Sequence, residues 1–430
     1  MAIVSYLIHV PILLLLAFWL YRKSAGMPLI NIFWPGFLFK MAAGIALGWV
    51  YTSYYNYQAD TILYFEDASK LAELAWTKPL AYFHILFFNQ PAPEITFGLW
   101  EQPRAFFMAK LVSFFNVFTG NTYWITGLYL SLLSFYAFWR LANTLVIIFP
   151  TSRIAAAIAF LLFPSVVFWS SGLIKETLAM ACITCSLHLL LSYNFGVQLP
   201  VSSLRKIGHI LFLLLSVYLV WKLKYYYLAV LLPVYLAYFA ALYLHKKWLA
   251  LTKPVIIIAL YLLLFTGILM LATMLHPSLQ MNVLIGTILE NHEVTLAASA
   301  PEDVIQFRQL QPTFISLSKN APLAVVSGLF RPFIWEAGTF FQYLTGTENL
   351  FILLTSLAVL FRLRKLPLAT HPQVYLLLTA TLIYILLLAT LLAFSAPNFG
   401  ALARYKIGFL PFLLYLIIWA VSFKKANSQQ

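Results

Sequence analysis

The sequence predicts an all-α protein that crosses a membrane many times. Hydrophobic residues make up 63% of the 430 residues and charged residues only 9%, whereas about a quarter of the residues in a soluble domain are charged. Aromatic residues reach 17%, which fits belts of tryptophan and tyrosine at the two membrane interfaces. Apolar segments also recur near the length of about 20 residues that crosses the hydrocarbon.

We interpret these segments as about eleven transmembrane helices. The first has no basic residue before its apolar core, so we expect a retained span rather than a cleaved signal peptide. No internal repeat is visible, and residues 1–430 are predicted to form a single membrane domain. The predicted spans are Ile3–Tyr21, Ile32–Tyr51, Tyr123–Ile148, Ile154–Ser170, Leu173–Ser192, Ile207–Trp221, Tyr225–Leu244, Pro254–Leu275, Phe340–Phe361, Gln373–Ser395 and Tyr405–Ser422.

The positions of lysine and arginine predict the orientation, because cytoplasmic loops carry an excess of both. One side of this topology holds many basic residues and no Asp or Glu, so we expect it to be cytoplasmic, with the N-terminus outside and the C-terminus inside. All 13 carboxylates fall on the opposite half. The basic residues that define the inner side are Arg22, Lys23, Arg153, Arg205, Lys206, Lys246, Lys247, Lys253, Arg362, Arg364, Lys365, Lys424 and Lys425.

This topology also accounts for the net charge of +14, which in a soluble protein would suggest nucleic acid. No Gly-rich phosphate loop, RNA-binding aromatic signature or zinc spacing is present, so no nucleic-acid partner is expected. Cys182 and Cys185 form a C-x-x-C inside an apolar run. Without the βαβ context of a redox motif, they are expected to pack within a helix.

Two long loops lie on the outer side, at residues 52–122 and 276–339. The segment Arg104–Phe118 is apolar but short and contains Lys110. We interpret it as an amphipathic helix in the outer interface, and Ala81–Phe88 as a second, shorter interfacial piece. The first outer loop is therefore expected to lie against the membrane.

The stretch Tyr54–Ala68, YYNYQADTILYFEDA, holds Asp60, Glu66 and Asp67 at the start of the first outer loop. An ionisable group at a membrane boundary is costly to keep beside lipid and is a candidate for function. Taken alone, the stretch fits a solvated acidic loop equally well.

Cations also occur at the outer face, where topology disfavours them. In SVVFWSSGLIKET, the Ser-Ser-Gly marks a break, and Lys175 and Glu176 begin the next helix. A glutamate suits a helix N-terminus and a lysine does not. In WKLKYYY, Lys222 and Lys224 fit either two snorkelling lysines or a site for a polyanion or lipid pyrophosphate.

Two later stretches repeat this pattern. LFRPFIWEAGTFF contains Arg331, suited to forked recognition of a phosphate, and Glu336 near a helix start. NFGALARYK contains Arg404 and Lys406. Glu348 lies inside a predicted span and is expected to face the bundle interior or water.

Carboxylates and cations facing one outer compartment fit a transferase with a lipid-phosphate donor. A carboxylate takes the proton of the acceptor hydroxyl as it attacks, and cations neutralise the departing phosphate. No nucleotide fold is needed, because the sugar arrives already attached to the lipid.

A long helix that leads to an outer loop with an early acidic motif, followed by interfacial helices and a bundle of spans, resembles the GT-C superfamily of polyprenyl-phosphate-sugar glycosyltransferases. The phrases FWSSGLIKETLAM, LFRPFIWEAGTFFQYLTGTENL and ALARYKIGFLPFLL are similar to those of membrane proteins of bacterial polysaccharide clusters. The resemblance implies that a first-loop acid is the catalytic base; by position this is Asp60, with Glu66 and Asp67 as alternatives. The chain differs in having an extra span before the acidic loop and no Asp-x-Asp, and no metal or other cofactor is assigned.

The predicted function is therefore an integral-membrane hexosyltransferase in the cytoplasmic (inner) membrane. It would move a sugar from a polyprenyl-phosphate donor to a glycan or lipid-linked acceptor. Lys175, Arg331, Arg404 and Lys406 are expected to bind phosphate. The accessory candidates are Glu176, Lys222, Lys224, Glu336 and Glu348. The alternatives are an O-antigen-type repeat-unit polymerase and a transporter or flippase for a lipid-linked sugar.

Overall fold

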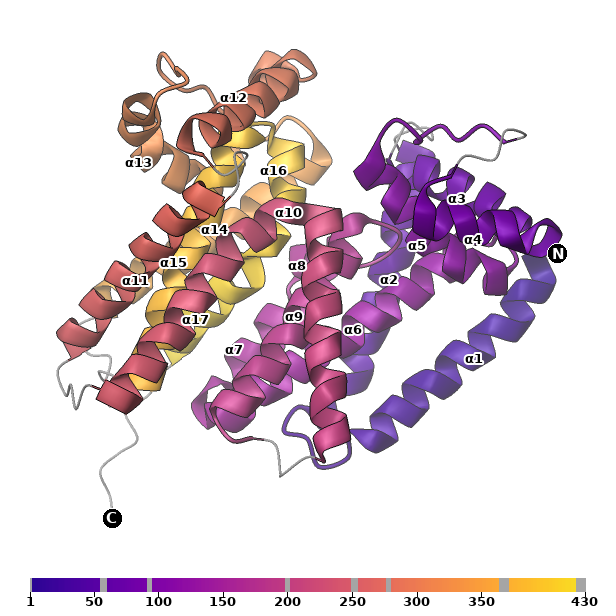
Figure 1. The fold of residues 1–430 in the computed structure, drawn as a ribbon, viewed down its shortest axis with the longest axis horizontal. Coiled ribbons are helices and arrows are strands. Elements are labelled where there is room, and N and C mark those ends of the chain that lie inside the picture. The colour runs from indigo at the N-terminus through magenta and orange to yellow at the C-terminus, as the bar shows by residue number, and fades with distance from the viewer. Residues whose placement is uncertain are drawn as a thin grey trace. The chain divides into compact units, whose positions relative to one another are not determined.

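The computed structural model describes residues 2–54, 60–90, 95–197, 202–248, 254–275, 280–362 and 371–422. These residues confirm the all-helical prediction, and the one β pairing among them is an isolated bridge between Val304 and Asn398. Packing divides the chain into two compact units, Met1–Tyr225 and Tyr226–Gln430. Both are drawn in Figure 1. The sequence predicted one membrane domain, and that remains a prediction.

The first unit consists of long helices joined by shorter ones. Its last element, α10, begins in this unit and continues into the second. In chain order the elements are α1 (Ala2–Lys23), η1 (Ile30–Ile32), α2 (Phe33–Trp49), η2 (Val50–Tyr54), α3 (Asp60–Thr77), α4 (Pro79–Phe88), α5 (Pro103–Thr119), α6 (Tyr123–Ile148), η3 (Pro150–Ser152), α7 (Arg153–Ala157), η4 (Ile158–Leu162), α8 (Pro164–Phe168), α9 (Lys175–Asn194) and α10 (Ser203–Trp248).

The second unit is also helical and ends in a sharply bent pair. After the second half of α10 it contains α11 (Pro254–Leu275), α12 (Met281–Ala297), η6 (Pro301–Asp303), α13 (Phe314–Phe330), η7 (Ile334–Glu336), α14 (Phe340–Arg362), α15 (Pro372–Ser395), α16 (Phe399–Tyr405), η9 (Lys406–Gly408) and α17 (Leu410–Ser422).

Among the described residues, eight helices are long and apolar enough to cross a membrane, or nine if the bent pair counts as one span. This is the composition of a multi-pass membrane protein. The bent pair turns by 71°. The candidate spans are Ile3–Lys23, Ile30–Tyr54, Tyr123–Ile148, Lys175–Asn194, Ser203–Lys247, Pro254–Met274, Phe340–Arg362 and Pro372–Ser395, with the bent pair Phe399–Gly408 and Leu410–Ser422 as the ninth.

One reason for the smaller number is that the predicted span Ile154–Ser170 is not one continuous helix. It is divided into α7, the π-helical η4 and the short α8. Pro164 has no backbone N–H and disfavours helical geometry in the residue before it. Phe163 is accordingly extended, with φ −72° and ψ 124°. The helix ends there, and a new turn starts at the proline.

The second reason concerns the spans predicted on either side of Lys222 and Lys224. They are joined in α10, whose single non-helical residue is Lys224, at φ −147° and ψ 67°. The predicted tight turn is therefore a one-residue break. At a rise of 1.5 Å per residue, the 45 residues of Ser203–Lys247 would extend about 68 Å if straight, over twice the hydrocarbon thickness.

The first long loop is more ordered than the sequence predicted. Its two expected pieces correspond to α4 and α5, but α3 is an additional helix. The buried residues of α3 recur at helical spacing, as in Tyr64, Asp67, Ala68 and Leu71. The helix is amphipathic and packs closely against α5 and α4.

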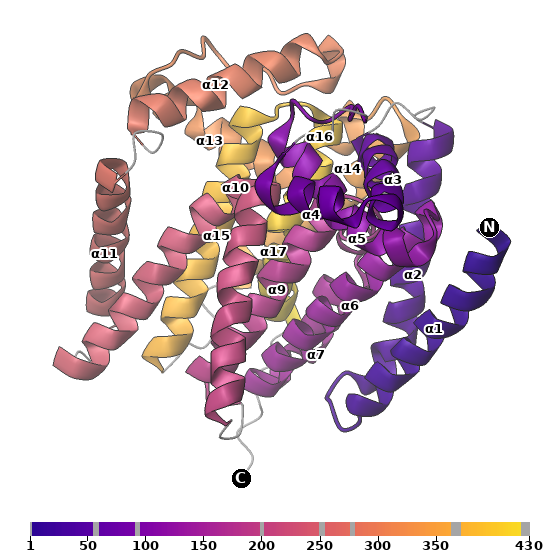
Figure 2. The same ribbon diagram turned by 45° about the vertical axis from the view of Figure 1, so that its right-hand side comes forward.

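In each unit the carboxylates gather toward one end. In the first unit, α3, α4 and α5 lie at the end opposite the turn between α1 and α2 (Figures 1 and 2). In the second unit, α12, α13 and α16 lie at the end opposite the start of α11 (Figures 1 and 2). We call the end that holds the carboxylates of each unit its acidic end. Six charged residues used to predict orientation lie outside the described residues: Glu94, Lys253, Arg364, Lys365, Lys424 and Lys425.

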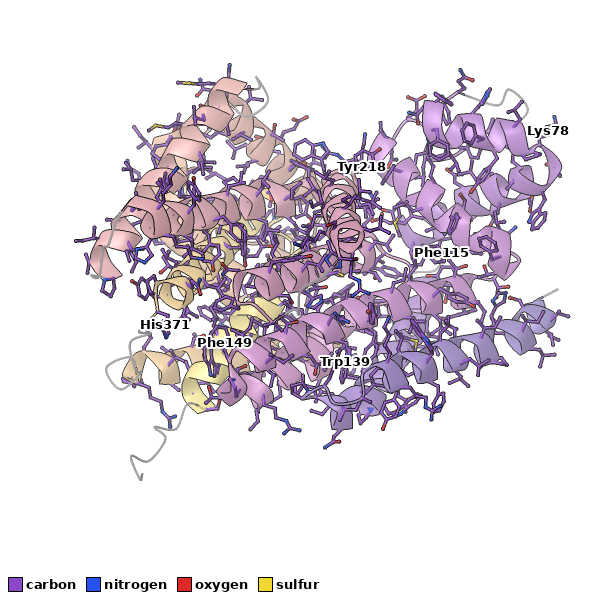
Figure 3. The ribbon with its side chains drawn as sticks, turned by 60° about the horizontal axis from the view of Figure 1, so that its bottom comes forward. Lys78, Phe115, Trp139, Phe149, Tyr218 and His371 are labelled. Atoms are coloured by element: carbon purple, nitrogen blue, oxygen red, sulfur yellow. The ribbon has the colours of Figure 1, made fainter. Side chains whose placement is uncertain are left out.

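An aromatic cluster joins α2 to α6 in the first unit. The ring of Phe33 lies 5.2 Å from that of Phe135 and 5.0 Å from that of Trp139, both edge to face. Trp139, labelled in Figure 3, donates its indole N–H to the hydroxyl of Ser24. Each such aromatic pair contributes about 0.5–1.5 kcal/mol beyond its buried area.

The second unit is organised around α15, which packs against α11, α12 and α13. A close approach brings η7 onto α14. A Cβ placed on Gly346 would lie 2.9 Å from the Cα of Ile334, so only glycine lets the two segments meet here. This contact fixes the segment that follows α13, which carries Arg331 and Glu336.

Candidate functional site

Asp60 lies in the first turn of α3 and is exposed. A carboxylate there interacts favourably with the positive end of the helix dipole. The next residue, Thr61, is buried, donates its hydroxyl to the carbonyl of Leu173 (2.7 Å) and lies 3.0 Å from the hydroxyl of Tyr123. The start of α3 is therefore fixed against the segment that leads into α9. Residues 55–59 of the acidic stretch lie outside the described residues.

The turn before α9 is built from the Ser-Ser-Gly that the sequence marks as a break. Gly172 has φ +67°, a conformation that side-chain-bearing residues rarely adopt. Thr177 donates its hydroxyl to the carbonyl of Ser171 at 2.8 Å and closes the turn. The first residue of α9, Lys175, has its ammonium 5.1 Å from the centre of the Tyr64 ring of α3. The starts of α3 and α9 therefore share one polar region.

Glu176 and Lys224 form an ion pair inside the first unit. Their Oε1 and Nζ atoms are 2.6 Å apart, and neither residue is more than 6% exposed. Lys224 is the non-helical residue of α10. The pair therefore connects the first turn of α9 to the break in α10, which is a structural role for two accessory candidates.

Residues next to this break contact the start of α5. The guanidinium of Arg104 lies 3.9 Å from the centre of the Tyr225 ring, a cation–π contact. Phe107 meets Tyr218 edge to face at 5.9 Å. Figure 3 labels Tyr218 on α10 and Phe115 on α5, the two helices that these contacts join.

Two lysines lie in the same region. Lys222 is exposed, with its ammonium 5.8 Å from the Tyr218 ring. Lys110 is buried and donates to the carbonyls of Ile85 and Leu86 and to the side chain of Asn89, which holds the end of α4. Burial, and next the charge of Lys222, lower the pKa of Lys110 to about 8.

The first unit therefore gathers five candidates of the sequence analysis, together with one residue that it did not single out, at the starts of α3, α5 and α9 and at the break in α10. We call the set the polar belt of the first unit. It comprises Asp60, Arg104, Lys175, Glu176, Lys222 and Lys224. Arg104 was missed. The signal that could have found it is its place directly after Pro103 at a helix start, where a cation opposes the helix dipole.

Asp67 is buried and holds a loop. Its two carboxylate oxygens accept the backbone N–H groups of Gly98 (3.0 Å) and Leu99 (2.8 Å), and Lys70 lies 3.6 Å away. A carboxylate with its acceptor positions used in this way anchors the segment before α5. Glu66, the other alternative base, is exposed on α3.

In the second unit, Arg331 and Glu336 bond to each other. The Nε of Arg331 donates to both carboxylate oxygens of Glu336, at 2.9 and 3.1 Å, and a second guanidinium nitrogen donates as well. Glu336 also accepts the backbone N–H of Phe333 at 2.8 Å. The Arg331 guanidinium, which the sequence predicted to bind a phosphate, therefore binds a carboxylate of its own segment.

Lys406 is 2% exposed and bonds to the protein at three points. Its ammonium donates to the carbonyls of Leu329 (3.2 Å) and Arg331 (2.7 Å) and to the Oδ1 atom of Asn349 (3.2 Å). All three donors of the ammonium are used. Lys406 therefore stabilises the carbonyls at the end of α13, and it is not free to bind a ligand.

The remaining candidates of this unit are only partly buried. Arg404 has its guanidinium 6.0 Å from the Tyr405 ring, and Tyr405 accepts the hydroxyl of Tyr227 at 2.9 Å on its carbonyl. Glu348 lies in α14 beside Asn349. The two stretches of this unit that suggested a family resemblance, LFRPFIWEAGTFFQYLTGTENL and ALARYKIGFLPFLL, therefore meet at Lys406.

Among the described residues, no three His, Cys, Asp or Glu side chains lie together in a way that could hold a metal ion. Comparisons with protein-family models, with curated proteins and with solved structures gave no match. The polar belt is therefore the basis for the function proposed below.

Proposed function

We propose that the protein is an integral-membrane glycosyltransferase that moves a sugar from a polyprenyl-phosphate donor to a glycan or lipid-linked acceptor. The observation that carries this proposal is the polar belt, in which the exposed carboxylate of Asp60 lies one turn before Tyr64, whose ring is 5.1 Å from the ammonium of Lys175. Of the two acids in the belt, Glu176 is fully buried against Lys224, whereas Asp60 is exposed. Asp60 is thus the belt carboxylate that an acceptor would reach.

The proposed reaction needs no cofactor for its balance. An acceptor hydroxyl attacks the anomeric carbon, a new C–O bond forms, and the bond from that carbon to the phosphate oxygen breaks. Asp60 accepts the hydroxyl proton, and Lys175 stabilises the negative charge of the departing polyprenyl phosphate. Positive charge that develops on the sugar in an oxocarbenium-like transition state is favoured by the same carboxylate.

The test is an assay with the purified full chain in liposomes and radiolabelled polyprenyl-phosphate sugars. We expect Asp60→Asn to lower the rate by a hundredfold or more, on the order of what a general base contributes. Glu73→Gln is the matched control, since it neutralises an exposed acid of the same helix. Near-normal turnover by Asp60→Asn would remove Asp60 from the mechanism.

That last outcome would favour the repeat-unit polymerase, in which the cations of the second unit matter more. The polymerase is the weaker candidate, because Arg331 and Lys406 already donate to Glu336, to carbonyls and to Asn349. A transporter or flippase would instead move lipid-linked sugar between leaflets without joining it to an acceptor, which the same assay separates by its product.

The proposed setting is the cytoplasmic membrane, with the acidic ends outside and the basic ends in the cytoplasm. A chain in which Cys182 and Cys185 are replaced would carry one new cysteine, either Lys78→Cys or Lys206→Cys. Lys78 lies between α3 and α4, and Lys206 lies in the first turn of α10. We expect a membrane-impermeant maleimide to label only the first on intact cells. Labelling of only the second would invert the topology.

A further inference from the structure

Two cations of the polar belt, Arg104 of α5 and Lys222 of α10, each lie beside an aromatic ring of the same stretch of α10. The guanidinium of Arg104 lies over the Tyr225 ring, and Lys222 lies near Tyr218, which contacts Phe107 of α5. Both cations are exposed. Their positions are set by two different helices, so the pair is a built feature of the first unit and not two neighbours in sequence.

Neither charge of this pair is balanced by an ion pair within the part of the chain that the structure describes. Among the described residues, no carboxylate lies within 4.0 Å of Arg104 or of Lys222. The buried acids nearby are engaged elsewhere: Glu176 pairs with Lys224, and Asp67 holds the backbone of Gly98 and Leu99. Positive charges without a partner repel one another, and an anion bound between them would relieve that cost.

Lys110 adds a third positive charge to this region. It lies close enough to Lys222 that the charge of Lys222 disfavours its protonated form. Its own donors are used on α4, so Lys110 acts through its field and not by direct contact. Three positive charges favour a ligand with about two negative charges, as a phosphomonoester carries at pH 7, over a phosphodiester with one. In the proposed reaction the sugar-bearing donor is a phosphodiester, so these charges are matched most closely to the polyprenyl phosphate that departs.

The aromatic side chains indicate that the anion is carried by a lipid. Trp221 is 47% exposed and Tyr218 is 49% exposed, on a helix apolar enough to cross a membrane. Tyrosine and tryptophan in such positions lie at the level of lipid headgroups. An anion held here is at the depth of a headgroup, with its chain extending into the hydrocarbon.

We propose that Arg104 and Lys222 bind the phosphate or diphosphate headgroup of a polyprenyl carrier. Arg104 supplies planar forked donors and Lys222 a point charge. The inference rests on the proposed function for the identity of the lipid and extends it by assigning the headgroup to α5 and α10.

The test measures binding and not turnover. The full chain in detergent is incubated with a polyprenyl phosphate, and retention of the lipid is measured by native mass spectrometry. Parallel arms use the corresponding polyprenol, phosphatidylglycerol and inorganic phosphate. We expect the polyprenyl phosphate to bind and each of the other three to bind at least about tenfold more weakly, since the loss of charge-assisted hydrogen bonds has effects of this order.

Variants locate the site. Arg104→Gln and Lys222→Gln should each weaken binding about tenfold or more, and Arg104→Lys should fall between wild type and Arg104→Gln because it keeps the charge and loses the fork. Lys78→Gln, an exposed lysine between α3 and α4, should bind as wild type does. Unchanged elution and unfolding temperature show that a variant is folded.

The result also separates this inference from the proposed function. Asp60→Asn should bind the polyprenyl phosphate as tightly as wild type. If wild type binds the lipid through Arg104 and Lys222 but transfers no sugar, the proposed function fails and the site stands. Equal binding by Arg104→Gln, by Lys222→Gln and by wild type overturns the site, as does equal binding of polyprenol, phosphatidylglycerol or inorganic phosphate.

Discussion

The carboxylate of Glu176 lies 2.6 Å from the ammonium of Lys224, in a pair that is closed to solvent. Glu176 begins α9, and Lys224 interrupts α10. The pair therefore joins two long helices of the first unit at the level of the polar belt. Burying both charges is costly, and leaving either one alone is more costly still.

Lys224→Met should destabilise the protein by about 3–5 kcal/mol, because it leaves the Glu176 carboxylate buried without its cation. The double variant Glu176→Leu, Lys224→Met should lose less unfolding free energy than Lys224→Met alone, because no unpaired charge of this pair remains. The unfolding temperature of the detergent-solubilised chain is the measurement. Lys222→Met, at an exposed position, should change stability by less than about 0.5 kcal/mol. Additive losses in the double variant would show that the pair does not act as a unit.

Asp67 gives a second prediction, which separates a structural acid from a catalytic one. Asp67→Ala removes the acceptors of the Gly98 and Leu99 N–H groups and should cost about 1–3 kcal/mol, because the Leu99 N–H is left buried without a partner. Limited proteolysis between α4 and α5 should become faster in this variant. Asp60→Asn should leave the proteolysis rate unchanged. If Asp67→Ala is cut at the wild-type rate but loses transfer activity, Asp67 and not Asp60 is the functional acid.

Much of the helical layout could be predicted from the sequence. The apolar segments and their lengths located α1, α2, α6, α9, α11, α14 and α15 to within a few residues, because a helix surrounded by lipid or by other helices is apolar along most of its length. The break at Phe163 had a sequence signal in Pro164, but the length of the apolar run concealed it. The amphipathic α3 was missed because charged residues interrupt its buried apolar residues, so that no continuous apolar run marks the helix.

The partners of the charged residues could not be predicted. Lys224 forms an ion pair with a carboxylate of another helix, and Lys406 donates to two carbonyls at the end of α13. Every residue has a backbone carbonyl, so the sequence does not show which lysine donates to one. A lysine bonded to a carbonyl therefore cannot be distinguished in the sequence from a lysine that binds a phosphate. For the same reason, Arg331 fitted a phosphate fork equally well before its bonds to Glu336 were known.

Lys406 carries a third prediction. Lys406→Met keeps the length of the side chain but leaves the carbonyls of Leu329 and Arg331 and the Asn349 side chain without their donor. We expect a loss of at least about 2 kcal/mol in the free energy of unfolding. Lys319→Met, at an exposed position of α13, is the control and should be nearly neutral. If Lys406→Met is as stable as wild type but binds lipid phosphate more weakly, Lys406 is a phosphate-binding residue, as the sequence predicted, and not a structural one.

His292 predicts how the stability of the second unit depends on pH. It lies in α12, is 7% exposed, and its Nδ1 atom is 2.7 Å from the carbonyl oxygen of Phe394. Burial lowers the pKa of His292 below its ordinary value of 6.5, while the bond to Phe394 and the charge of Glu293 act in the opposite direction. The imidazole is therefore neutral near pH 7 and donates its Nδ1–H to the carbonyl.

The sign of the pH effect follows from this lowered pKa. As the pH falls below about 6.5, the unfolded chain takes up the proton before the folded chain does, so the folded state loses stability, by at most about 1.4 kcal/mol per pH unit. The loss ends once the pH is below the folded pKa. The unfolding temperature of wild type should therefore fall more steeply between pH values of about 7 and 5 than that of His292→Gln, which has no titrating group at this position. Parallel curves would mean that the histidine is equally easy to protonate in the folded and unfolded chains, and the packing of α12 on the end of α15 would then have to tolerate a charged imidazole.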